Sequence, residues 1–116
     1  MVNIIFEHLY TVEGYVTFAI TVVSGKFSGA SNFCISENSL ADAVLTLREI
    51  YNKLSGEYQM NDYNSDDFIL FEFEKYGHLK VSGQVGGSHR QQYLVYQFMT
   101  DQTVLAEIIS SFRSMT

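Results

Sequence analysis

Three histidines, one cysteine and thirteen carboxylates are the side chains of this sequence that could carry acid–base, nucleophilic or metal chemistry. His8, His78 and His89 fall on separate predicted strands or turns, and there is neither an HExxH helix nor a CxxC pair at zinc-site spacing. A lone cysteine, Cys34, among scattered histidines does not make a nucleophile with its base. The glycine-rich stretch 83–90 joins two predicted strands and opens no helix, unlike phosphate sites. We therefore predict no enzyme, no metal site and no cofactor.

The acidic residues are unevenly distributed, and their clustering favours a binding role. Six of the thirteen lie within residues 57–74, and no Lys or Arg occurs between Lys53 and Lys75. The formal net charge of −6 repels a phosphate backbone, which argues against nucleic acid as a partner, and attracts a basic protein. The plainer alternative is a solvated face that keeps the protein soluble. The candidate partner-binding residues are Glu57, Asp62, Asp66, Asp67, Glu72 and Glu74.

Length and cysteine content predict one domain spanning residues 1–116 in a reducing compartment. A chain of this length buries a real core without covalent staples, and a single cysteine forms no intrachain disulfide. The first residues lack the pattern of a secretory signal, and no apolar run approaches the roughly 20 residues that span a bilayer. We expect a cytoplasmic protein with no membrane contact. A homo-oligomer is left open and is not predicted.

The elements that position these side chains follow from hydrophobic periodicity. Short alternating runs of aromatic and β-branched residues predict strands, and two stretches with helical spacing predict helices. Turn residues between consecutive strands predict hairpins. The expected fold class is α+β, a single antiparallel sheet of about six to seven strands with two helices packed on one face. The expected order is β-β-β-α-β-β-β-β-α, with strands at 2–10, 15–23, 27–36, 57–63, 67–76, 78–85 and 92–99.

Helix ends are predicted from capping chemistry. Ser39 is the expected N-cap of the first helix, and Gly56 is expected to end it in a left-handed conformation. The period changes from strand to helix at the Thr100–Thr103 stretch, where Thr100 or Asp101 can accept hydrogen bonds from the first helical turn. This polar cluster is thus predicted to be a cap, and replacing Asp101 with Ala is predicted to lower stability.

A series of short motifs gives the sequence a family resemblance. In order along the chain they are Phe27-Ser28-Gly29, Gly56, Gly77-His78, Gly83 and Asp101-Gln102-Thr103. Their order and spacing resemble the WapI-type immunity proteins of bacterial polymorphic and contact-dependent toxin systems, from about Gly25 onward. The Leu79 that follows Gly77-His78 replaces the Val or Ile more usual in that family. The resemblance implies a cytoplasmic protein that binds and neutralises a cognate secreted toxin domain, often a nuclease.

The predicted charge suits this implied function, because nuclease toxins engage phosphates and tend to be basic. We expect charge reversal at Asp62, Asp66 and Asp67 to weaken toxin binding mainly by slowing association. The alternative is a non-catalytic protein-interaction or small-ligand-binding module with another partner. An enzyme is the third hypothesis, and a metal bound by His78 or His89 would be the observation in its favour.

Overall fold

The computed structural model describes residues 2–116 of the chain, and side chains from residue 4 onward. The predicted order of strands and helices is confirmed, with one short 3-10 turn added between the fifth and sixth strands. No described helix is both long enough and apolar enough to cross a membrane. The elements are β1 (Val2–Val12), β2 (Tyr15–Ser24), β3 (Phe27–Ser36), α1 (Glu37–Lys53), β4 (Glu57–Asn61), β5 (Phe68–Phe73), η1 (Lys75–Gly77), β6 (Leu79–Val85), β7 (Leu94–Thr100) and α2 (Gln102–Arg113).

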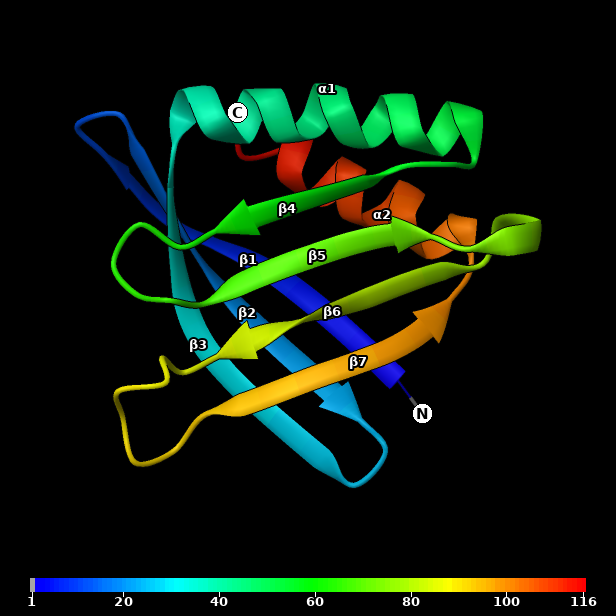
Figure 1. The fold of residues 1–116 in the computed structure, drawn as a ribbon. Coiled ribbons are helices and arrows are strands. Elements are labelled where there is room, and N and C mark those ends of the chain that lie inside the picture. The colour runs from blue at the N-terminus through cyan, green and yellow to red at the C-terminus, as the bar shows by residue number, and fades with distance from the viewer. Residues whose placement is uncertain (1) are drawn as a thin grey trace.

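The strands form two antiparallel sheets, in the orders β1-β2-β3 and β4-β5-β6-β7, so the prediction of a single sheet is wrong. Figure 1 shows the three-stranded sheet crossing behind the four-stranded one, with both helices along the same side of the pair. α1 packs on α2 and β4, and α2 also packs on β1. Two sheets form because each has one apolar face, and packing the sheets together buries both apolar faces.

The core lies between the two sheets and is closed on the helical side by α1 and α2. Inward residues of β2 alternate as predicted, and Phe18 is fully buried. Its ring centroid lies 5.2 Å from that of Phe33 on β3 and 5.6 Å from that of Phe112 on α2. Ile69 and Phe71 of β5 are also fully buried and belong to the same core cluster. Aromatic contacts of this kind add to the stability gained from buried apolar area.

The helix ends agree with capping chemistry, but two of the three predicted caps are displaced. Ser36, three residues before the predicted Ser39, is the N-cap of α1, and its hydroxyl accepts from the Ser39 N–H at 3.1 Å. Leu54, with φ 51°, is the left-handed C-cap that was predicted at Gly56. The prediction for α2 is confirmed at Asp101, whose carboxylate accepts from the Thr103 N–H at 2.9 Å. Short serines spaced three apart can each cap a helix, so sequence alone does not choose between them.

Candidate interaction surface

The outward face of the four-stranded sheet is the surface on which the predicted acids can meet a partner. Strand alternation buries Ile69, Phe71 and Val81 and turns their neighbours outward. The antiparallel register then aligns the outward residues of β4, β5, β6 and β7 in rows across the sheet. The rows are Glu57, Glu72, Lys80 and Met99; then Gln59, Leu70, Ser82 and Gln97; then Asn61, Phe68, Gln84 and Val95. Only the first row is charged.

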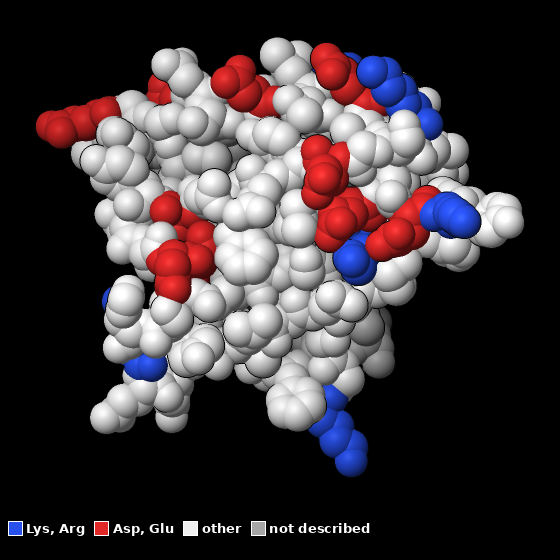
Figure 2. Space-filling view, in the orientation of Figure 1, with Lys and Arg blue, Asp and Glu red and all other residues white. Residues whose placement is uncertain are grey.

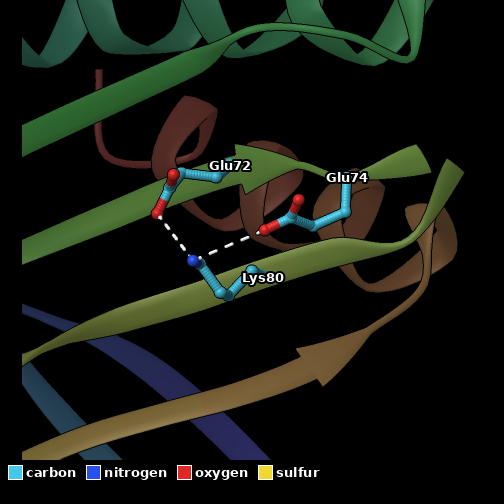
Figure 3. A network of polar contacts seen from close by, with 3 residues as sticks. All are labelled: Glu72, Glu74 and Lys80. Atoms are coloured by element: carbon cyan, nitrogen blue, oxygen red, sulfur yellow. Dashed lines mark ion pairs between the residues drawn. The ribbon is translucent and has the colours of Figure 1, made fainter.

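The charged row forms a small ion-pair network at one end of the sheet. Lys80 Nζ lies 3.5 Å from Glu72 Oε1 and 3.4 Å from Glu74 Oε1, as drawn in Figure 3. The charge of Glu72 and the hydrogen bond to Glu74 raise the pKa of Lys80 above its ordinary value. Glu57 lies directly across from Glu72 and is exposed. Glu72 and Glu74 thus share one ammonium group, and with Glu57 beside them this end of the sheet keeps a net negative charge.

Uncharged side chains, polar and apolar, occupy the rest of the outward face. Val95 is 65% exposed and Met99 50% exposed on the edge strand β7, while Phe68 and Leu70 are half-buried on β5. Figure 2 shows this face, with the acidic groups gathered to either side of an uncharged centre. An apolar centre with a charged rim is the usual make-up of a protein–protein interface. These four residues were missed as site residues, although the alternation in β5 and β7 already turns them outward.

Asp67, one of the six predicted site residues, does not belong to this surface. Its side chain is 3% exposed. One carboxylate oxygen accepts from the Gly87 N–H at 2.8 Å and from Gln84 Nε2 at 3.0 Å. The other accepts from the Gly86 N–H at 3.0 Å. The carboxylate therefore ties the loop after β4 to the loop after β6.

Asp66 and Asp62 extend this structural role to the neighbouring positions. Asp66 is exposed, yet it accepts from Gln84 Nε2 at 2.8 Å and from both the amide and the hydroxyl of Ser88. The Ser88 hydrogen bonds lower the pKa of Asp66 to about 2. Asp62 accepts from the Cys34 N–H of β3 at 2.7 Å and from Ser65 Oγ at 2.6 Å. We call Asp62, Asp66 and Asp67 the aspartate latch.

The aspartate latch also explains why Cys34 is buried although it faces away from Phe33. The Tyr63 N–H donates to the Cys34 carbonyl oxygen at 2.8 Å, so the loop after β4 covers the end of β3. Short Asp and Ser side chains that bond nearby backbone groups are typical of such loops. The Asp and Ser residues of the Asp62–Asp67 stretch already indicated such a loop, but its acids were treated as candidate partner-binding residues.

The described side chains offer little to a metal ion. Among residues 4–116 no group of three or more His, Cys, Asp and Glu side chains is arranged to hold one. The carboxylates of the aspartate latch already accept hydrogen bonds from amide and hydroxyl groups. The histidines lie on separate elements: His8 on β1, His78 after η1 and His89 in the loop after β6.

The fold and its outward sheet face define a small α+β scaffold with the surface make-up of a protein-binding module. The model of the immunity protein WapI-like family matches residues 11–116. The chain therefore belongs to the WapI-like immunity protein family, which confirms the resemblance noted in the sequence and extends it toward the N-terminus. No curated protein matches the chain closely enough to count as a relative. Membership supports an immunity function in general terms, and such families bind a cognate toxin and are generally non-catalytic.

Proposed function

We propose that this protein neutralises a cognate secreted toxin domain in the bacterial cytoplasm by binding over it, and that the toxin is a basic nuclease. The 1–116 domain acts as the binding unit, with no catalysis of its own. Family membership supports the immunity role. The observation that carries the mechanism is the row of Glu57, Glu72 and Lys80 beside exposed apolar side chains on one sheet face. Such a face attracts a cationic surface and then excludes water from it.

Three of the predicted acids form the proposed contact surface: Glu57, Glu72 and Glu74 keep carboxylates at the outward end of the sheet. Asp67 has a supporting role, because burial keeps it from a partner. Asp62 and Asp66 lie in the same loop with their carboxylates engaged by the chain itself. Charge reversal in the aspartate latch would thus change the fold of the loops as well as the charge, which makes it a poor test of binding.

The test begins with the toxin domain encoded beside this chain's gene, taken as the C-terminal domain of a large secreted protein. Co-expression with this protein is expected to restore growth, and the two are expected to co-purify. Growth arrest despite soluble immunity protein, together with no co-purification, would contradict the proposed function. Nuclease activity of the free toxin on DNA or RNA, lost in the complex, tests the nature of the toxin.

A matched pair of double variants tests the electrostatic part. Glu57→Gln with Glu74→Gln removes two charges from the proposed contact surface, whereas Glu7→Gln with Glu49→Gln removes two exposed charges from β1 and α1. The first double variant is expected to associate about tenfold more slowly at low salt, with a weaker salt dependence, because steering acts on the association rate. The control is expected to bind like the parent. If both double variants associated equally slowly, net charge alone would set the association rate. If both associated as fast as the parent, electrostatic steering by these glutamates would be contradicted.

A further inference from the structure

Among residues 2–116, three residues other than glycine have a left-handed backbone: Glu13 with φ 51°, Leu54 with φ 51° and Tyr76 with φ 64°. This conformation is unfavourable for an L-residue with a bulky side chain. All three lie at a turn or a helix end, and Tyr76, like Glu13, precedes a glycine of positive φ, Gly77 with φ 75°, in a turn between two strands. Glu13 precedes Gly14 in the two-residue turn from β1 to β2, which needs positive φ at both positions. Leu54 is the C-cap of α1, where left-handed geometry ends a helix.

The side chain of Tyr76 makes almost no stabilising contacts that could offset its unfavourable backbone conformation. Its side chain is 95% exposed, so the ring has almost no packing against the described chain. Gly or Asn would adopt φ 64° with less strain and would leave the turn after β5 unchanged. Folding stability therefore does not account for a tyrosine at this position. Strained residues of this kind are typical of functional sites.

The turn that contains Tyr76 is closed by a backbone hydrogen bond and lies close to both helices. The Glu74 N–H donates to the His78 carbonyl oxygen at 2.7 Å and closes the turn. A Cβ placed on Gly77 would lie 3.6 Å from Gln102 Oε1 and 4.0 Å from Leu54 Cδ1, so the rear of the turn approaches the start of α2 and the end of α1. Figure 1 shows this turn projecting beyond the ends of β5 and β6. The turn is thus closed by the chain's own hydrogen bond, without a partner.

The position of Tyr76 joins it to the proposed contact surface. It follows Glu74 by two residues, and Glu74 shares Lys80 with Glu72 at the same end of the sheet. Tyrosine is enriched among the residues that carry most of the energy of protein interfaces, because it offers a large rigid ring with a polar tip. A turn backbone that is already closed by a hydrogen bond has less conformational entropy to lose on binding than an open loop has.

We propose that Tyr76 is an anchor residue for the cognate toxin, its ring filling a pocket on the toxin while the neighbouring glutamates meet basic side chains at the pocket rim. The proposal rests on the proposed function and adds to it a residue that determines affinity. At this end of the sheet Glu57, Glu72 and Glu74 outnumber Lys75 and Lys80, and this excess of negative charge favours a cationic protein as the occupant.

The experiment compares two substitutions that relieve the same backbone strain at different places. Tyr76→Gly and Glu13→Gly each put glycine at a left-handed position, one at the proposed anchor and one at the turn from β1 to β2. Binding to the immobilised C-terminal toxin domain is measured by surface plasmon resonance, and stability by urea unfolding. Both variants are expected to keep or raise the urea midpoint. Only Tyr76→Gly is expected to bind at least tenfold more weakly, mainly through faster dissociation.

Tyr76→Asn separates loss of the ring from added flexibility, because Asn tolerates left-handed geometry without the freedom of glycine. It is expected to weaken binding as much as Tyr76→Gly does. Parent-like affinity of either Tyr76 variant would overturn the anchor assignment while leaving the immunity function intact. So would an equal loss of affinity in Glu13→Gly. A parent protein that does not bind the toxin domain at all would instead overturn the proposed function and the anchor with it.

Discussion

At one end of the four-stranded sheet Glu57, Glu72 and Glu74 lie on the outward side, and the last two share a single lysine, Lys80. At the other end the aspartate latch points its carboxylates into hydrogen bonds with backbone amides and polar side chains. Both groups carry three negative charges within one eighteen-residue stretch of sequence. One group is available to a partner, and the other is used by the fold.

The difference follows from side-chain length and from the local backbone. Aspartates in a loop lie within reach of nearby N–H groups, and a carboxylate that accepts several of them becomes part of the structure. Glutamates on the outward positions of a strand have ladder-bonded neighbours, so their carboxylates extend into solvent. Position on a loop or on a strand therefore says more about the role of an acid than the local density of charge does.

The largest effect on stability is expected from Asp67→Ala. This change removes the acceptor for the Gly86 and Gly87 N–H groups and for Gln84 Nε2, and leaves buried donors without partners. Unsatisfied buried donors cost about 1–3 kcal/mol each, and some will regain water, so we expect a loss of about 3 kcal/mol in unfolding free energy. Urea unfolding followed by circular dichroism measures it.

Asp67→Asn is the control for Asp67→Ala, since it keeps one acceptor oxygen and nearly the same volume. We expect it to fall between the parent and the alanine variant. A loss below about 1 kcal/mol in Asp67→Ala would mean that water replaces the carboxylate readily. The contrast between the two ends of the sheet would then disappear. Under conditions where Asp67→Ala remains folded, its toxin affinity is expected to equal that of the parent.

A smaller effect on stability, which is lost at acid pH, is expected from substitution of Asp66. Its pKa is about 2 in the folded protein, below the ordinary value of 3.8, because the ionised form accepts the Ser88 hydrogen bonds. A lowered folded-state pKa contributes stability that is fully present above about pH 4 and is lost as the pH falls toward 2. Urea midpoints of the parent and of Asp66→Asn are therefore expected to differ at pH 6 and to converge as the pH falls through that window. A constant difference from pH 6 to pH 2 would contradict this role.

The order of strands and helices could be predicted from the sequence, whereas the packing of one sheet on the other could not. Alternation in β2 and β5 identifies Phe18 and Phe71 as buried, and this holds in the structure. The same alternation does not say whether the opposing layer is a helix or a second sheet, which is why one sheet was predicted where two exist. The burial of Asp67 was beyond reach for a similar reason, because its partners at Gly86 and Gly87 are some twenty residues away and meet it only after both hairpins have formed.

The smallest stability effect is expected from Glu57→Gln, at the opposite end of the sheet from the aspartate latch. Glu57 lies directly across from Glu72, and like charges at opposed positions are mildly destabilising. Removing one of them should raise the unfolding free energy by about 0.3 kcal/mol at low salt, and the gain should vanish at high salt as screening takes over. Urea unfolding at two salt concentrations measures this. If Glu57→Gln destabilised the protein as strongly as Asp67→Ala, the outward glutamates would be structural too, and their availability to a toxin would lose its main physical support.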